Sequence, residues 1–273
     1  GPPFLTGVWH ELAGDVKSIC EEYELKVETV HTHIGSGSDP AVWQKVAGMT
    51  LDLVRQFPDV KTVDLGGGYK TGRMMDEVST DMQAVGMPVR DAFHAFSSET
   101  GRELKLEIEP GTFLVANAGA LITTVQDVVT TGSSGYDFIK LDAGMTDLLR
   151  PSLYGALHPI VIVPSGGGGR ARGKSEYVVV GHCCESGDLL TPKVGSPEEI
   201  DERLLTKADI GDLCVVEGCG AYVSGMCAKN YNSFPEAPEM MLDGKGELHV
   251  IRQRQQLEQI TQNEVEVPLK IFK

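Results

Sequence analysis

A strand-like run that ends in a loop of small residues is the feature that most restricts how this chain can fold. Residues 27–34 carry valine and isoleucine at intervals typical of a strand, and Gly35-Ser36-Gly37-Ser38 follows almost directly. β-Branched residues favour strands, whereas glycine and serine favour loops with accessible backbone N–H groups. In α/β proteins, loops at strand ends hold flat or phosphorylated ligands. The segment therefore predicts a ligand-binding loop at the end of a buried strand.

Two further junctions repeat this pattern downstream. The run 62–65 ends in Gly66-Gly67-Gly68, and the run 104–108 ends in Glu109-Pro110-Gly111. Successive glycines let the backbone approach an anion closely, although a lone triple glycine is also typical of a flexible turn. An anion cradle and a carboxylate at strand ends, together with a histidine, fit a phosphorylated heteroaromatic cofactor better than any one of them does alone.

The first junction carries two histidines, His31 and His33, whose side chains would lie on the same side of a strand. Three interpretations follow: a metal pair, a core or hydrogen-bonded histidine, or an imidazole ring that faces a ligand. A metal site usually needs a third or fourth ligand, and the sequence shows no clear His or Cys cluster nearby. The ligand-facing ring is therefore the favoured interpretation, and we predict no bound metal.

The order of the expected elements changes near residue 115. Before it, helical stretches at 12–23, 41–56 and 82–100 alternate with the strand-like runs, as in parallel βαβ units. After it, strand-like runs follow one another at 120–131, 138–141, 160–163, 177–180, 213–216 and 248–252. We therefore expect an α/β domain over residues 1–115 and a mainly antiparallel β-domain over residues 116–273, whose end could return to the first domain.

The composition of the chain argues against several classes of binding partner. The 273 residues carry a formal net charge of −15, and this acidic balance argues against nucleic acid and anionic membranes as partners. No apolar run approaches the length of a membrane span. The six cysteines form no C-x-x-C pair, and the adjacent Cys183 and Cys184 cannot easily bridge each other. We expect reduced thiols, a cytoplasmic location and a small-molecule ligand.

Several short motifs follow one another along most of the chain, from about Val8 to Glu264. They are His31–Ser36, Asp64–Gly68, Glu109–Gly111, Asp142–Met145, Arg150–Tyr154, Cys184–Asp188, Gly220–Tyr222 and Asn230–Ser233. In this order the set resembles the fold-type III pyridoxal-phosphate decarboxylases, most closely the diaminopimelate decarboxylases among them. The resemblance implies α/β plus all-β architecture: the C-terminal part of a TIM-like (β/α)8 barrel that binds pyridoxal phosphate, then an antiparallel β-domain. It also implies a homodimer with shared active sites.

The resemblance further implies pyridoxal 5′-phosphate as the cofactor and assigns residues to it. His33 would stack on the pyridine ring, and Glu109 would keep the pyridine nitrogen protonated so that the ring can accept electrons. The remaining cofactor-binding residues would be Ser36, Gly66, Gly67 and Gly68 at the phosphate, together with Gly111 and Tyr222.

The implied reaction is the decarboxylation of meso-2,6-diaminopimelate to L-lysine and CO2, a step in lysine biosynthesis. Cys184 would be the general acid that protonates the carbanion, and His33 is the second residue that we count as catalytic. Arg150, Tyr154 and Glu185, with Tyr222, would bind the substrate, because a guanidinium matches its distal carboxylate and a carboxylate matches its distal ammonium.

Two departures from the family pattern bear on this expectation. Thr112 stands where the family usually has an arginine after Glu-Pro-Gly, and its hydroxyl can donate one hydrogen bond but brings no charge. No lysine lies in the early-strand context of the family's Schiff-base lysine, and three strands before the β-domain are fewer than the eight that close a barrel. We therefore expect the chain to be the C-terminal portion of a longer enzyme, with an N-terminal segment missing.

Two alternatives stay open. One keeps the reaction and changes the substrate to another basic amino acid or a carboxylated polyamine, although Arg150 favours a substrate with a distal carboxylate. The other is a non-catalytic fragment or relative that lacks the Schiff-base lysine. Retention of Cys184 and Glu185 weighs against this second alternative.

Overall fold

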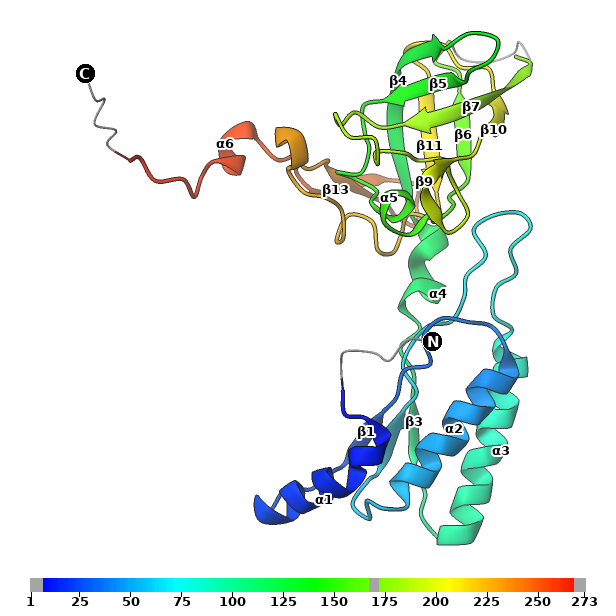
Figure 1. Ribbon diagram of the computed structural model, residues 1–273, viewed down its shortest axis with the longest axis vertical. Coiled ribbons are helices and arrows are strands. Elements are labelled where there is room, and N and C mark those ends of the chain that lie inside the picture. The colour runs from blue at the N-terminus through cyan, green and yellow to red at the C-terminus, as the bar shows by residue number, and fades with distance from the viewer. Residues whose placement is uncertain (1–6, 167–171, 268–273) are drawn as a thin grey trace. The chain divides into compact units, whose positions relative to one another are not determined.

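The chain forms two compact units, Gly1–Val115 and Ala116–Lys273, in a computed structural model (Figure 1). The structure describes residues 7–166 and 172–267. Each unit has its own cluster of buried apolar side chains, so each is described by itself. None of the described helices is both long enough and apolar enough to cross a bilayer.

A three-stranded parallel sheet lies at the centre of the first unit. Its strands are β1 (Thr29–His31), β2 (Thr62–Asp64) and β3 (Lys105–Glu107), in the order β1–β2–β3. The last residues of the strands are paired in register, His31 with Asp64 and Asp64 with Glu107. Because parallel strands run in the same direction, the loops predicted to bind a ligand all leave the same edge of this sheet.

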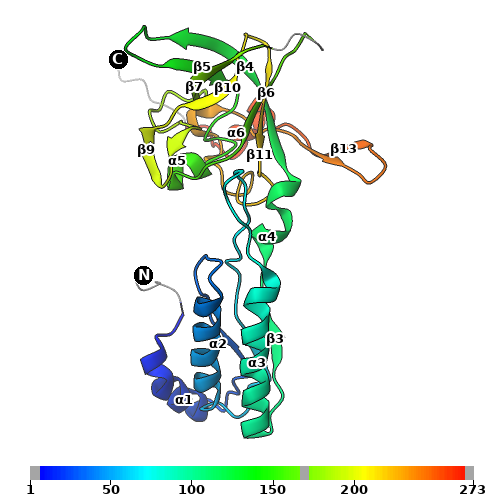
Figure 2. The same cartoon turned by 90° about the vertical axis from the view of Figure 1, so that its right-hand side faces the viewer.

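Helices cover the sheet, and their ends follow local signals. The unit contains η1 (His10–Leu12), α1 (Ala13–Glu22), α2 (Pro40–Val54), α3 (Met82–Thr100) and α4 (Gly111–Val115). The Asp39 carboxylate accepts the Ala41 N–H at 2.9 Å and so caps α2, and Asp81 caps α3 in the same way. Figures 1 and 2 both show α2 and α3 side by side, and Trp43, Leu51, Val89 and Phe96 are among the residues that they bury.

A six-stranded sheet forms the second unit, in the order β10–β7–β5–β4–β11–β6. Its strands are β4 (Ala120–Thr130), β5 (Asp137–Leu141), β6 (Ile160–Val163), β7 (Lys174–Val180), β10 (Arg203–Thr206) and β11 (Leu213–Glu217). Most neighbours are antiparallel as predicted, but β5 and β7 are parallel. The chain between these two strands passes through α5 (Arg150–Tyr154) and β6, which provides the long crossover that a parallel pair needs.

Smaller elements complete the second unit. They are η2 (Ala116–Ala118), β8 (Pro192–Lys193), β9 (Ser196–Ile200), η3 (Tyr231–Ser233), β12 (Glu239–Leu242), β13 (Leu248–Arg252) and α6 (Leu257–Ile260). The β12–β13 hairpin extends away from the six-stranded sheet (Figure 2). Residues 165–169, a serine followed by four glycines, have the composition of a loop, and positions 167–169 lie outside the described residues.

Candidate functional site

The loop after β2, Gly66-Gly67-Gly68, consists of glycines because neighbouring backbone leaves no space for side chains. A Cβ at Gly67 would lie 2.5 Å from the Glu109 carbonyl oxygen, and one at Gly68 would overlap the Gly35 carbonyl oxygen. Gly68 also has a φ of +92°, which residues with a Cβ rarely adopt. The Glu109 N–H donates to the Gly66 carbonyl oxygen at 3.0 Å. The loops after all three parallel strands are therefore packed backbone against backbone.

Most of the cofactor residues predicted in this unit gather at these loops. A Cβ at Gly66 would lie 2.8 Å from His33 Nδ1, so the imidazole ring lies directly beside the glycine loop. His33, Ser36 and Glu109 are all exposed. Ser36 belongs to the loop after β1, and Gly111 is the first residue of α4. A crowded glycine cradle with exposed polar side chains around it suits a phosphorylated ring, so these residues fit the predicted cofactor.

The other histidine of the first junction has a different role. His31 Nδ1 lies 2.8 Å from Asp64 Oδ2, and Asp64 Oδ1 accepts the Gly66 N–H at 2.9 Å. Partial burial raises the pKa of Asp64, but the Gly66 N–H and His31 outweigh it and hold that pKa below its usual value. His31 is therefore a hydrogen-bonded histidine, which supports one of its three interpretations.

The fold adds two carboxylates near His31 that the sequence did not associate with it. Donor atoms of His31, Asp64 and Glu109 all lie within 4.8 Å of one another. Among the described residues the β12–β13 hairpin holds a comparable group, with Asp243 and Glu247 in the turn and His249 in β13. Both groups are at least partly exposed, and each contains a histidine that is hydrogen-bonded to an aspartate, His31 to Asp64 and His249 to Asp243.

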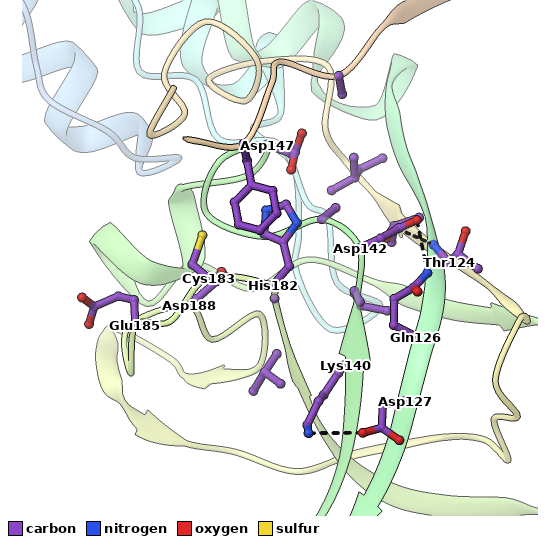
Figure 3. Close-up of a pocket in the computed structure, with 18 of the residues that line it drawn as sticks. Thr124, Gln126, Asp127, Lys140, Asp142, Asp147, His182, Cys183, Glu185 and Asp188 are labelled. Carbon is purple, nitrogen blue, oxygen red and sulfur yellow. Dashed lines mark hydrogen bonds and ion pairs between the residues drawn. The ribbon is translucent and has the colours of Figure 1, made fainter. Parts of the chain in front are cut away.

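A cavity of about 1040 Å³ opens in the second unit beside strands β4, β5 and β7. Figure 3 shows Cys183 and Glu185 on one side of it and Thr124 and Asp142 on the opposite side. Cys184 also lines the cavity. The other three predicted residues, Arg150, Tyr154 and Tyr222, are not among the described residues that line this cavity. The structure thus brings together two of the five predicted catalytic and substrate-binding residues of this unit.

A buried carboxylate holds the loop that carries Cys184 and Glu185. Asp188 is 3% exposed, and its carboxylate accepts the Cys183 N–H at 2.8 Å and the Met145 N–H at 2.7 Å. A Cβ at Gly144 or Gly181 would overlap the same carboxylate. Asp188 therefore ties two loops together, and the sequence analysis assigned it no role although it belongs to one of the motifs.

The two adjacent cysteines have different environments. Burial raises the pKa of the Cys183 thiol to about 12, and the Asp188 carboxylate acts in the same direction. Cys184 is exposed, and its N–H donates to Asn232 Oδ1 at 3.2 Å. Both cysteines line the cavity, but Cys183 is a partly buried neutral thiol, whereas Cys184 is exposed.

Glu185 remains ionised because several donors point at its carboxylate. The Gly187 N–H donates to Oε1 at 3.1 Å, and the Tyr231 hydroxyl donates to Oε2 at 3.2 Å. These two contacts lower the pKa of Glu185, with the Gly187 N–H contributing most. An exposed carboxylate with a lowered pKa can bind an ammonium group at neutral pH.

The remaining predicted residues of this unit lie elsewhere. Arg150 begins α5, and its Nε is buried with no hydrogen-bond partner among the described residues. Tyr154 ends the same helix and is 54% exposed, and Tyr222 is 60% exposed with a φ of +57°. A buried guanidinium N–H without a partner is unusual in proteins and can donate to a ligand.

Comparison with known proteins identifies close matches along most of the chain. Residues 20–220 match the model of the family described as "Pyridoxal-dependent decarboxylase, C-terminal sheet domain". The chain is 35% identical over 256 residues to diaminopimelate decarboxylase of Escherichia coli K12, covering 93% of this chain and 60% of that protein. The chain thus spans about 60% of the length of such a relative.

Solved structures agree with the sequence matches. A crystal structure of diaminopimelate decarboxylase superimposes with a TM-score of 0.87 at 34% identity, covering 94% of this chain and 60% of that one. Diaminopimelate decarboxylase from Helicobacter pylori, solved in complex with L-lysine, superimposes with a TM-score of 0.78 at 28% identity, covering 94% and 59%.

Proposed function

Because the chain belongs to the pyridoxal-dependent decarboxylase family, we propose that the whole protein decarboxylates meso-2,6-diaminopimelate to L-lysine and CO2, with pyridoxal 5′-phosphate as its cofactor. The observation that carries this proposal is the crowded glycine cradle 66–68 beside His33 and Glu109. The matched relatives are named diaminopimelate decarboxylases, and one of them was solved with L-lysine.

The first unit would be the C-terminal part of a TIM-like barrel, and the second unit its sheet domain. In the described sheet β1 and β3 are edge strands, and an isolated parallel sheet with two open edges is rare in soluble proteins. Strands supplied from outside residues 1–273 would pair with these edges. The same missing part would supply the Schiff-base lysine.

The cofactor would be held by the loops of the first unit. Residues 66–68 and Ser36 would bind its phosphate, His33 would cover its ring, and Glu109 would accept the N–H of the pyridine nitrogen. Gly111 and Tyr222 would complete this site. When bound, pyridoxal phosphate supplies an acceptor for the electron pair that remains on the substrate Cα after CO2 leaves.

The second unit would bind the distal end of the substrate and deliver a proton. The ionised Glu185 would pair with the distal ammonium, and the Arg150 guanidinium with the distal carboxylate, with Tyr154 and Tyr222 beside them. The bond between Cα and the departing carboxylate breaks, and its electron pair then forms a bond to the proton of the Cys184 thiol. The thiolate left on Cys184 regains a proton from solvent.

Turnover by the full-length protein tests this function. Formation of L-lysine from meso-diaminopimelate is expected, and Cys184→Ala should lower kcat by about 10²–10⁴-fold, the usual size of a general-acid contribution. Cys183→Ala is the matched control and should retain most activity, because that thiol does not face the substrate in this proposal. Equal losses in the two variants would contradict the role of Cys184.

One observation favours a different substrate, namely another basic amino acid or a carboxylated polyamine. Thr112 has a hydroxyl where the family usually carries an arginine. Turnover of ornithine or a carboxylated polyamine, measured beside diaminopimelate, separates the two possibilities. Preference for diaminopimelate supports Arg150 as a carboxylate clamp. In that case Arg150→Lys should be strongly damaging, because an ammonium cannot replace a bidentate guanidinium.

The protein would work in the cytoplasm as a homodimer whose active sites take Cys184 and Glu185 from the neighbouring subunit. Mixing an inactive lysine variant with inactive Cys184→Ala should then restore activity in hybrid dimers. If subunits demonstrably exchange and no activity returns, the shared site is wrong.

A further inference from the structure

We propose that Tyr231 and Asn232 are positioning residues for Glu185 and Cys184. The proposal deepens the decarboxylase function proposed above and rests on it. Tyr231 would orient the Glu185 carboxylate for the substrate's ammonium group, and Asn232 would fix the backbone from which the Cys184 thiol projects.

Tyr231 restrains the side chain that would select the substrate. Its hydroxyl donates to Glu185 Oε2 at 3.2 Å, while Oε1 accepts the Gly187 N–H at 3.1 Å. A glutamate has three rotatable bonds, and donors on both oxygens restrict the carboxylate to one orientation. The contact acts on both partners, because it raises the pKa of Tyr231 and contributes to the lowered pKa of Glu185.

Asn232 acts on the neighbouring residue through the backbone. Its side-chain oxygen accepts the Cys184 N–H at 3.2 Å. The residue has a φ of +50°, and Asn230 and Ser233 also have positive φ values of +58° and +63°. Residues other than glycine adopt left-handed conformations at an energetic cost, and they do so preferentially at functional sites. Asparagine tolerates this conformation better than most residues.

The segment that carries both residues is anchored independently of them. The Phe234 ring stacks on His182, with centroids 3.6 Å apart and an interplanar angle of 8°. Asn230 Nδ2 donates to the Phe234 carbonyl oxygen at 3.0 Å and to Gln255 Oε1 at 2.5 Å. These contacts give Tyr231 and Asn232 a fixed base from which to hold another loop.

A purely structural role does not account for this arrangement. Tyr231 and Asn232 are both exposed, so neither contributes a buried side chain to the core. Among the described residues, their side chains form hydrogen bonds to Glu185 and Cys184, the two residues with proposed roles in substrate binding and proton transfer. The left-handed backbone at Asn232 is therefore associated with the hydrogen bond to Cys184 and not with side-chain packing in the core.

Tyr231→Phe in the full-length holoenzyme tests the first half of the proposal. We expect KM for meso-diaminopimelate to rise about tenfold with a much smaller change in kcat, because one hydrogen bond to the charged Glu185 is lost. The Kd of L-lysine, measured by calorimetry, should rise by a similar factor. Tyr136→Phe, at an exposed tyrosine outside the site, is the matched control and should leave both values unchanged.

Asn232→Gly tests the second half, because glycine adopts the left-handed conformation but lacks the acceptor for the Cys184 N–H. We expect kcat to fall about tenfold, with KM nearly unchanged and the melting temperature retained. The rate at which iodoacetamide alkylates Cys184, followed by mass spectrometry, should change as well. Ser233→Gly is the control, because it relieves a left-handed residue and leaves the Asn232 contact in place.

Different results would refute the decarboxylase function and the positioning role of Tyr231 and Asn232. If the wild-type protein converts diaminopimelate while Tyr231→Phe and Asn232→Gly behave like their controls, the positioning role is refuted and the decarboxylase function stands. If the wild-type protein forms no L-lysine, the proposed function is refuted. The alkylation rate of Cys184 and the affinity for L-lysine then still decide the positioning role.

Discussion

The candidate sites of the two units hold their loops together by different means. In the first unit, the loops after β1, β2 and β3 approach so closely that side chains are excluded, and Gly67 and Gly68 are required. In the second unit, buried carboxylates bind the loops together. Asp188 and Asp212 are the buried carboxylates among the described residues, and both lie in this unit.

The difference lies in what occupies the space between the loops. Parallel strands deliver successive loops to one edge, so their backbones can pack directly and need glycine where they touch. In the second unit the loops that meet at Asp188 follow β5 and β7, which are also a parallel pair, but a side-chain carboxylate lies between these loops. A carboxylate can accept several N–H groups at once and so joins such loops without backbone contact. Substitutions at these positions should therefore act through steric overlap in one unit and through lost hydrogen bonds in the other.

Gly68→Ala should have the largest effect. The added Cβ overlaps the Gly35 carbonyl oxygen at a φ of +92°, and overlap and conformational strain together should cost about 4 kcal/mol of stability. Hydrogen exchange should show faster exchange in residues 29–70, and cofactor should be lost. Gly37→Ala, where a Cβ meets no atom within 4 Å, is the control; a similar loss there would refute the steric explanation.

Asp188→Ala should have the next largest effect, and in the second unit alone. The Met145 and Cys183 N–H groups would lose their acceptor, at a cost of about 3 kcal/mol for two buried donors. Hydrogen exchange should accelerate in residues 142–147 and 181–188 and stay unchanged around β1–β3. Asp127→Ala removes an exposed carboxylate that pairs with Lys140 at 3.3 Å and should cost less than about 1 kcal/mol.

The ionisation of Asp212 should make the stability of the second unit depend on pH. Burial raises its pKa, but the Asp209 and Ser165 N–H groups and the Arg172 guanidinium outweigh burial and hold the pKa below its usual value. Its contribution to stability is therefore full above the unfolded pKa of about 4 and is lost as the pH falls through the lower folded value. Asp212→Asn should cost about 2 kcal/mol at neutral pH.

The difference between wild type and Asp212→Asn should shrink on acidification, as measured by urea unfolding from pH 7 down to pH 2. Asp209 also pairs with Arg172, at 3.1 Å, but its side chain is exposed, so Asp209→Asn is the milder control. A gap that stays constant with pH would contradict the linkage to Asp212.

The comparison also explains which features the sequence could predict. The strand-like runs before Gly35 and Gly66, and the caps Asp39 and Asp81, are signals carried by neighbouring residues. The corresponding strands and the helices α2 and α3 were therefore predictable. The parallel pairing of β5 with β7 depends on a crossover of some 30 residues, which has no local signature, and the short polar strand β9 has no strand-like pattern.

The same distinction applies to the candidate sites. Gly66–Gly68 and the Cys184–Glu185 pair belong to motifs and could be singled out from the sequence, although their functional roles stay predictions. The burial of Asp188 and the left-handed backbone of Asn232 arise from tertiary contacts. Both residues belong to the motifs named above, but Asp188 has one hydrogen-bond partner 43 positions away, Met145, and Asn232 has one 48 positions away, Cys184. No local pattern reveals such partners.

A glycine outside the loops provides the smallest and sharpest test of the comparison. Gly48 lies inside α2, and a Cβ there would meet no atom within 4 Å. Because alanine has less freedom to lose in a helix, Gly48→Ala should stabilise the first unit by about 0.5–1 kcal/mol, measured by urea unfolding. Gly86→Ala in α3, where a Cβ is equally unobstructed, should behave alike. The constraint on glycine would then belong to the strand-end loops and not to the unit as a whole. Destabilisation by Gly48→Ala would mean instead that another part of the full protein packs closely against that face of α2.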